Sequence, residues 1–179
     1  MPESTKPRVA VIGLGSMGYG MATSLRRAGL DVTGCDVSAD AVKRFVCEGG
    51  QGAGTPAEAA KAADIVVSVV VNAAQTEAIL FGANGVAEAL AKGAVLISSA
   101  TMDPDVARRL AKQLEATGRH YLDAPISGGA QRAAQGELTI LASGSPAAFA
   151  KARTALDAMA AKLYELGDEH DVTILGLIR

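Results

Sequence analysis

Residues 8–18 read RVAVIGLGSMG, and this stretch decides the fold. Its first part, 8–12, is an aliphatic run typical of a strand that is buried on both faces of a parallel sheet. Gly13, Gly15 and Gly18 follow at the spacing G-x-G-x-x-G, and apolar residues then recur at helical intervals. Glycines at this spacing between a buried strand and a helix predict a turn that binds the phosphates of a dinucleotide.

Each glycine of the turn has a predicted task. Gly13 permits the tight turn, Gly15 lets the main chain approach a pyrophosphate, and Gly18 lets the helix pack closely on the strand. The first N–H groups of the helix and the positive end of its dipole then face the phosphates. The alternative is a glycine-rich turn without a ligand, which this context disfavours. The predicted phosphate-binding residues are Gly13, Leu14, Gly15, Ser16, Met17 and Gly18.

Asp36 ends the next aliphatic run, about 20 residues along from the turn. A carboxylate at that place accepts hydrogen bonds from the hydroxyls of the adenosine ribose and repels a 2′-phosphate. Neither Val37 nor Ser38 supplies the cation that NADP would need. The residues therefore favour NAD as the cofactor, and a solvated aspartate at a strand end is the alternative.

Strand-like and helical patterns alternate along the chain. This alternation predicts an α/β, Rossmann-type, doubly wound and mostly parallel sheet with helices on both faces. The segments 49–54 and 127–136 contain glycines and read as irregular connections. The predicted strands are 8–12, 32–36, 64–71, 94–99, 119–122, 138–142 and 162–166. The predicted parts are a disordered N-terminal tail at 1–7, an NAD-binding domain at 8–167 and an atypical C-terminal tail at 168–179.

The composition excludes several classes of protein. The 179 residues are 49% hydrophobic and 20% charged, with a formal net charge of -2 and no basic block, so nucleic acid is not an expected partner. No segment approaches the ~18 apolar residues of a membrane span, and residues 1–7 do not resemble a signal peptide. Cys35 and Cys47 have neither redox-motif nor zinc-ligand spacing, so no metal site is predicted. We expect a cytoplasmic protein.

Four further segments add a resemblance. They are 13–22 (GLGSMGYGMA), 82–86 (GANGV), 123–129 (DAPISGG) and 135–140 (QGELTI). In this order they resemble the 3-hydroxyacid (β-hydroxyacid) dehydrogenase family, which includes 3-hydroxyisobutyrate, tartronate semialdehyde and threonate dehydrogenases. The resemblance implies an oxidoreductase that transfers a hydride from a small hydroxy acid to NAD.

The resemblance also assigns roles to individual residues. Val71 and Asn72 would border the adenosine side of NAD, and Thr101 would bind near its nicotinamide end. Where the family commonly reads Ile-Asp-x-Ser-Thr, this chain has Ser-Ser-Ala-Thr-Met at 98–102. That variant resembles the L-threonate dehydrogenase branch of the family.

A cradle for the substrate carboxylate is implied for Ser127, Gly128 and Gly129. Successive N–H groups together with a hydroxyl suit an anion. Without the resemblance, these three residues would be interpreted as an ordinary loop.

The resemblance finally implies a catalytic lysine and a second domain beyond the cofactor domain. The family's general base is a lysine in a glycine-rich stretch beyond a segment like 164–167, and an all-helical domain comes after it. Residues 168–179 do not resemble that stretch, and no lysine follows Lys162. His120 and His170 are not expected to replace the base, so we predict NAD binding with little or no turnover and no catalytic residue. A homodimer through surface left exposed is a further expectation.

Two alternatives stay open beside the dehydrogenase. One is a nucleotide-binding module without catalysis. The other is a different Rossmann enzyme, such as a methyltransferase, which Asp36 would suit but which gives no reason for the segment 123–129.

Overall fold

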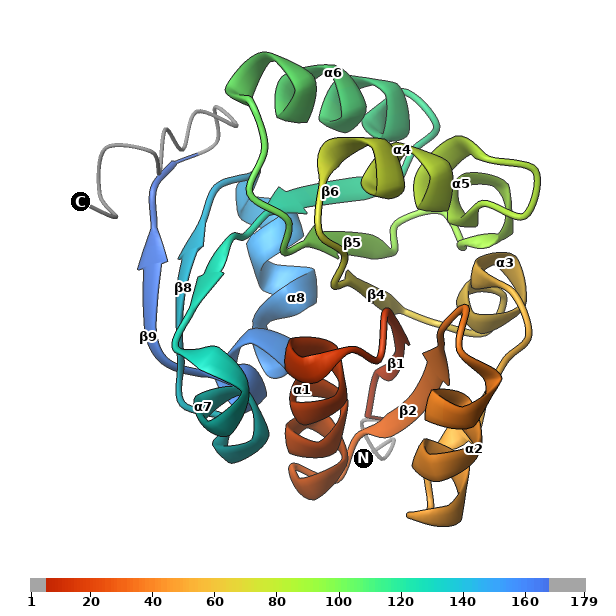
Figure 1. Cartoon of the computed structure of the whole chain (residues 1–179). Helices are drawn as coiled ribbons and strands as arrows, with labels where there is room; N and C mark the ends of the chain where they lie inside the picture. The colour runs from red at the N-terminus through yellow and green to blue at the C-terminus, as the bar shows by residue number, and fades with distance from the viewer. Residues whose placement is uncertain (1–5, 168–179) are drawn as a thin grey trace, which may run out of the picture.

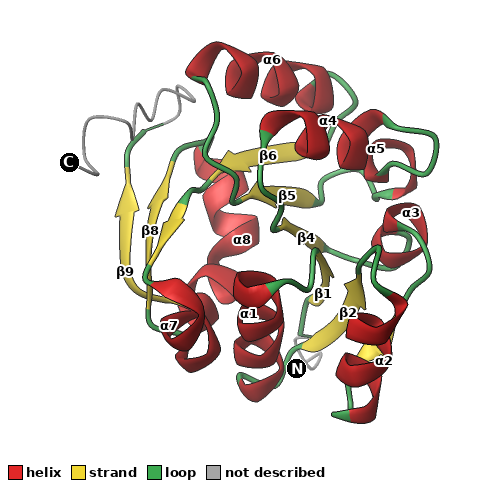
Figure 2. Cartoon of the chain, in the orientation of Figure 1, coloured by secondary structure: helices red, strands yellow, loops and turns green. Residues whose placement is uncertain are grey.

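The computed structural model describes residues 6–167, so the tail 168–179, with His170, and residues 1–5 lie outside the described residues. Within residues 6–167, six parallel strands form the main sheet in the order β3-β2-β1-β4-β5-β6 (Figures 1 and 2). The strands of this sheet are β1 (Arg8–Ile12), β2 (Asp31–Cys35), β3 (Gln51–Gly52), β4 (Ile65–Ser68), β5 (Val95–Ser98) and β6 (His120–Asp123). The prediction of a doubly wound, Rossmann-type sheet is confirmed.

Helices cover both faces of the sheet. Side chains alternate along each strand, so Val9 and Val11 face one hydrophobic core while Ala10 and Ile12 face the other. The first core packs against α1, α2, α7 and α8, and the second against α3 to α6. None of the helices within residues 6–167 is both long and apolar enough to span a membrane. The helices are α1 (Ser16–Arg27), α2 (Ala39–Cys47), α3 (Pro56–Ala60), α4 (Ala73–Phe81), α5 (Val86–Ala89), α6 (Pro104–Glu115), α7 (Gly129–Gln135) and α8 (Pro146–Met159).

A small second sheet lies beside the first. Its strands are β7 (Ile126–Ser127), β8 (Leu138–Ala142) and β9 (Ala160–Glu165), with β7 antiparallel and β9 parallel to β8. An antiparallel bridge between Asp123 and Ser143 joins the end of β6 to the end of β8. Within residues 6–167, antiparallel pairing therefore occurs only in this small sheet and at the bridge that joins it to the main sheet.

Three predicted segments differ in the structure. The segment 49–54, interpreted as an irregular connection, contains the two-residue edge strand β3. β4 ends at Ser68, so the predicted strand 64–71 is too long. The Val69 amide still donates to the Ile12 carbonyl at 2.8 Å, but Val71 is exposed, and Val69, Val70 and Val71 all line a cavity. The segment 127–136, interpreted as an irregular connection, contains α7. Its helical character was hidden because its glycines stand at the two ends of the helix, and Ala133 alone is buried in it.

Helix α7 packs closely on α1 because Gly20 has no side chain. A methyl group there would stand 2.7 Å from the amide nitrogen of Ala134, and the Ser24 hydroxyl donates to the Ala133 carbonyl at 2.7 Å. We expect Gly20→Ala to lower the free energy of unfolding by roughly 1–3 kcal/mol, because the two helices must move apart. Urea denaturation measures this, with Thr23→Ala on the same helix as the control. An unchanged midpoint for Gly20→Ala would contradict the close packing.

Candidate cofactor-binding site

The candidate site lies at the carboxyl ends of β1 and β4, where the strand order of the main sheet reverses (Figure 1). The helices that come after these two strands, α1 and α4, pack on opposite faces of the sheet. They leave a crevice between them, and open α/β sheets bind their ligands at such a switch point. The glycine turn 13–18 joins β1 to α1 at this crevice.

The three glycines of the turn have different surroundings. Gly13 has a φ of 100°, and a Cβ there would overlap the carbonyl oxygen of Val69. A Cβ at Gly18 would overlap the carbonyl oxygen of Gly13, so strand and helix touch at this point. A Cβ at Gly15 would meet nothing within 4 Å. Gly13 and Gly18 are thus required by the fold, whereas Gly15 borders open space.

The open space above Gly15 suits a pyrophosphate. Gly15 is the N-cap of α1, and no side chain caps the first N–H groups of this helix. Free N–H groups and the helix dipole together stabilise an anion. The residues present therefore fit the phosphates of a dinucleotide.

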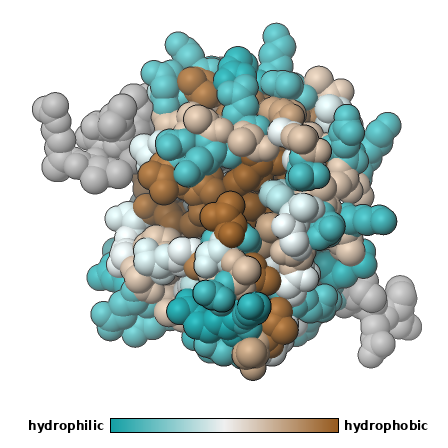
Figure 3. Space-filling model, turned by 45° about the vertical axis from the view of Figure 1, so that its right-hand side comes forward, coloured by the Kyte–Doolittle hydropathy of each residue, from teal (hydrophilic) through white to brown (hydrophobic). Residues whose placement is uncertain are grey.

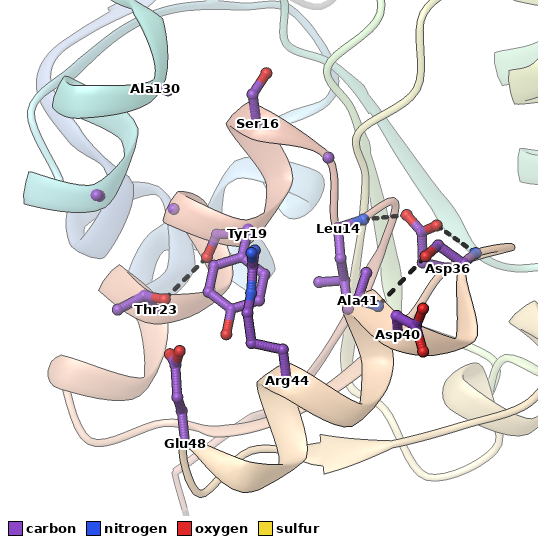
Figure 4. Close-up of a pocket in the computed structure, with 14 residues that line it drawn as sticks. Leu14, Ser16, Tyr19, Thr23, Asp36, Asp40, Ala41, Arg44, Glu48 and Ala130 are labelled. Atoms are coloured by element: carbon purple, nitrogen blue, oxygen red, sulfur yellow. Dashed lines mark hydrogen bonds between the residues drawn. The ribbon is translucent and has the colours of Figure 1, made fainter.

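Asp36 joins the turn to the start of α2. One carboxylate oxygen accepts a hydrogen bond from the Leu14 amide at 2.6 Å, and the other accepts one from the Ser38 amide at 2.8 Å (Figure 4). A carboxylate oxygen can accept more than one hydrogen bond, so lone pairs remain for the hydroxyls of a ribose. The carboxylate therefore lies beside the glycine turn.

A cavity of about 440 Å³ extends from the turn between the loops that come after β2 and β4. Val37 and Val71, which belong to these two loops, are 107% and 82% exposed. β2 and β4 flank β1 in the sheet, so the two valines lie on two sides of the turn. Figure 3 shows apolar side chains gathered in the middle of one face, between hydrophilic ones. Exposed apolar side chains beside a cavity provide surfaces for a flat ring such as adenine.

Cys35 lines the same cavity at the end of β2. Burial, with a smaller contribution from the neighbouring Asp36 carboxylate, raises the pKa of its thiol to about 11. The thiol therefore stays protonated at neutral pH and packs as a small apolar group.

A second groove of about 890 Å³ lies on the other side of the turn, between α1, α2 and α7 (Figure 4). Leu14 and Ser16 line it, and Asp36 borders both this groove and the first cavity. The Arg44 guanidinium stands over the Tyr19 ring, 3.8 Å from its centroid. This cation–π contact holds α2 against α1.

The predicted cofactor residues divide into three groups. Gly13, Gly15, Asp36 and Val71 line the cavity together, and Leu14 and Ser16 face the second groove. Met17 packs against the hydrophobic core, and Gly18 is buried. The residues that line neither the cavity nor the second groove are Met17, Gly18, Asn72 and Thr101.

The Asn72 side chain has a structural partner. Its carbonyl oxygen accepts the Gln75 amide at 2.9 Å and so caps α4. Thr101 is exposed in the loop between β5 and α6. Sequence reasoning missed Val37, Gln75 and Ala78, which line the cavity. Of these, only Val37 could have been found from the sequence. It is an aliphatic residue that lies between the predicted strand ending at Asp36 and the helix that follows Ser38, so it belongs to neither element.

The predicted substrate cradle lies at the junction of β7 and α7. Ser127 ends β7, and Ser127, Gly128 and Gly129 are all exposed. Gly128 and Gly129 have φ angles of 141° and 77°, which side chains rarely adopt. No side chain caps the start of α7, so its first N–H groups are free. These three residues lie outside the cavity that contains Gly15 and Asp36.

Residues 8–167 match the family described as the NAD binding domain of 6-phosphogluconate dehydrogenase. The chain belongs to this family of NAD-binding domains. The prediction of NAD as the cofactor is thereby confirmed.

Relatives of this NAD-binding domain confirm the resemblance to 3-hydroxyacid dehydrogenases. An L-threonate dehydrogenase from Cupriavidus necator is 48% identical over 162 residues, which are 90% of this chain and 54% of that protein. The crystal structure of a 3-hydroxyisobutyrate dehydrogenase from Salmonella typhimurium superposes with a TM-score of 0.90 at 40% identity, over 96% of this chain and 61% of that one. An imine reductase variant from Myxococcus stipitatus in complex with NAD+ gives 0.84 at 27% identity, over 92% of this chain and 56% of that one. The chain thus spans about half the length of the curated relatives that it matches.

Proposed function

We propose that this chain binds NAD as the cofactor domain of a dehydrogenase that oxidises a small hydroxy acid, with L-threonate as the substrate. The observation that carries the proposal is the open space over Gly15 at the start of α1, with the Asp36 carboxylate beside it. The relative from Cupriavidus necator, named L-threonate dehydrogenase, supports the substrate, as does the sequence SSATM at 98–102.

The residues of the site have distinct tasks in this proposal. The N–H groups after Gly15 bind the pyrophosphate, Asp36 binds the adenosine ribose, and Val37 and Val71 contact the adenine ring. Thr101 contacts the cofactor near its nicotinamide end. When bound, NAD supplies the acceptor for the hydride that leaves the substrate carbon bearing the hydroxyl.

The substrate carboxylate is bound by Ser127, Gly128 and Gly129 in this proposal. Two observations support this role: Gly128 and Gly129 have positive φ angles, and no side chain caps the start of α7. Both expose backbone N–H groups. A carboxylate held there fixes the orientation of the hydroxy acid relative to the cofactor, which is a large part of what a dehydrogenase must supply.

One observation favours a second candidate, an NAD-binding module without turnover. Among residues 6–167, the single histidine, His120, begins β6 and therefore lies at the edge of the sheet opposite the carboxyl ends of the strands, where the substrate is proposed to bind. A hydroxyl that loses hydride needs a nearby group to accept its proton, and positioned proton acceptors contribute about 10²–10⁴-fold.

Calorimetric titration with NAD, NADP and S-adenosylmethionine tests the binding proposal. We expect NAD to bind, and absence of binding at roughly 1 mM NAD would end both candidates. The absorbance of NADH, followed with L-threonate and with 3-hydroxyisobutyrate, then separates the candidates. Turnover with L-threonate supports the dehydrogenase, and binding without turnover on either acid supports the module.

Asp36→Ala is expected to weaken NAD binding by roughly 10- to 100-fold, since hydrogen bonds to a charged group contribute about 1.5–3 kcal/mol. The variant also loses the bonds to the Leu14 and Ser38 amides that hold the turn. Calorimetry gives the dissociation constant. Asp40→Ala, an aspartate that lines only the second groove, is the control. Equal affinities of Asp36→Ala and the unaltered chain would remove Asp36 from the site.

A further inference from the structure

Three polar side chains lie side by side at the carboxyl ends of three neighbouring strands. Ser68 of β4 pairs in register with Ser98 of β5, and Ser98 pairs with Asp123 of β6. Register partners in a parallel sheet point to the same face, and neighbouring strands are about 4.8 Å apart. We call Ser68, Ser98 and Asp123 the buried polar row.

The buried polar row is almost completely withdrawn from solvent. Ser68, Ser98 and Asp123 are 1%, 0% and 5% exposed. Within residues 6–167, neither the Ser68 hydroxyl nor the Oδ1 atom of Asp123 has a hydrogen-bond partner, and the buried hydroxyls of Ser99 and Ser143 have none either, whereas the Ser98 hydroxyl lies beside the Tyr121 phenol. Most buried polar groups in proteins are paired, so a cluster of unpaired ones at one end of a sheet calls for a functional explanation.

Asp123 is the one buried carboxyl group among the described residues. Burial raises its pKa to about 7. The titratable group that faces it is the Tyr121 phenol on the same strand, whose pKa is raised mainly by its own burial. Its register partner on β5 is Ser98, and its bridge partner after β8 is Ser143. The helices that pack on β6 keep their arginines at the surface: Arg108 and Arg109 of α6 and Arg153 of α8 are 44%, 50% and 43% exposed.

The position of the row points to the cofactor. A dinucleotide crosses the carboxyl ends of the strands, and Asp36 places its adenosine half over β1 and β2. The other half then lies over β4, β5 and β6, the strands that carry the buried polar row (Figure 2). The nicotinamide ring carries a positive charge in NAD and none in NADH. A carboxylate in a region of low dielectric constant attracts such a charge more strongly than it would in water.

We propose that Asp123 senses the charge of the nicotinamide ring, so that the ionised carboxylate favours NAD and the protonated acid does not discriminate between NAD and NADH. The proposal rests on the proposed binding of NAD. Asp123 is a positioning residue here, which acts through its charge and takes no part in bond making. When NAD binds, the proton of Asp123 leaves for solvent, and when NADH binds it stays.

Linkage makes this effect measurable. If NAD binds better to ionised Asp123, NAD binding must release protons over the pH range in which Asp123 titrates. We expect roughly half a proton per NAD bound near pH 7 and almost none per NADH. The ratio of the NADH to the NAD dissociation constant should rise by roughly 3- to 10-fold from pH 6 to pH 8.

Titration calorimetry in buffers of different ionisation enthalpy measures both quantities on the full chain. Asp123→Asn removes the ionisable group at nearly constant shape, and we expect it to release no proton and to show a ratio that is independent of pH. Asp157→Asn removes an exposed aspartate of α8 and should behave like the unaltered chain. Tyr121→Phe should also keep the proton release, because the phenol does not titrate near neutrality.

The outcomes separate the two proposals. Absence of NAD binding would overturn the proposed function together with this inference. NAD binding without proton release, or with the same release in Asp123→Asn, would overturn the inference alone. Proton release by the unaltered chain is measured without any variant, so the test remains decisive even if Asp123→Asn fails to fold. Release near pH 7 with NAD and not with NADH supports the inference. Equal release with both cofactors contradicts it.

Discussion

Alanine at Gly15 should abolish most NAD binding and leave the fold intact, whereas alanine at Gly18 should damage the fold. A methyl group at Gly15 meets no protein atom within 4 Å, but it enters the open space over the start of α1 where the pyrophosphate is proposed to bind. We expect the dissociation constant for NAD to rise by roughly 10- to 100-fold, about 1.4 kcal/mol for each factor of ten. The melting temperature should change little, because the φ of −68° at Gly15 is open to alanine.

Gly18→Ala is the matched counterpart on the same turn. Its methyl group would overlap the Gly13 carbonyl oxygen, a backbone atom that cannot move without reshaping the turn. Overpacking of this kind lowers the free energy of unfolding by roughly 1–3 kcal/mol, occasionally more. Thermal denaturation and calorimetry on both variants make the comparison. If Gly15→Ala binds NAD as the unaltered chain does, the pyrophosphate does not lie where we propose.

The parts of the fold that depend on local chemistry could be predicted. The turn from Gly13 to Gly18 is predictable because its glycine spacing, between an aliphatic strand and a helix, is a pattern within a few residues of the chain, although the atom that a Cβ at Gly13 would overlap belongs to the distant Val69. Helix starts were equally accessible, as at Thr55, whose hydroxyl accepts the Glu58 amide at 3.1 Å just before Pro56. Local patterns therefore located the strand, the turn and the helix that make the site.

The walls of the site depend on contacts between distant segments. The aliphatic residues after Ser68 match the composition of a strand, and only the end of the neighbouring strands shows that Val71 must leave the sheet. Helix α7 was missed because its single buried residue, Ala133, gives no periodic signal, while its contact with Gly20 is far away in the sequence.

The buried polar row was out of reach for the same reason. Ser68, Ser98 and Asp123 become neighbours through the register of three strands, and no spacing along one chain reveals that register. The resemblance placed Asp123 in a motif but gave it no role. Its burial and its missing partners are properties of the folded sheet alone.

Asp123→Asn should make the protein more stable at alkaline pH than the unaltered chain. Burial raises the pKa of Asp123 from 3.8 to about 7 in the folded state, whereas the unfolded chain keeps the ordinary value. Below about pH 4 both states hold the proton, and the carboxyl group then has no effect on the pH dependence of stability. As the pH rises towards 7, only the unfolded state ionises, so stability falls by about 1.4 kcal/mol for each pH unit.

The total loss above pH 7 is on the order of 4 kcal/mol, and asparagine, which does not ionise, avoids it. We expect the difference in unfolding free energy between Asp123→Asn and the unaltered chain to be smallest near pH 4 and to reach a plateau above pH 7. Urea denaturation at a series of pH values measures this difference, and Asp157→Asn, which changes an exposed carboxylate, should give a nearly flat line. If the difference for Asp123→Asn is also independent of pH, the carboxyl group must be solvated in the folded protein. A buried carboxyl group would have a raised pKa, and the difference would then depend on pH.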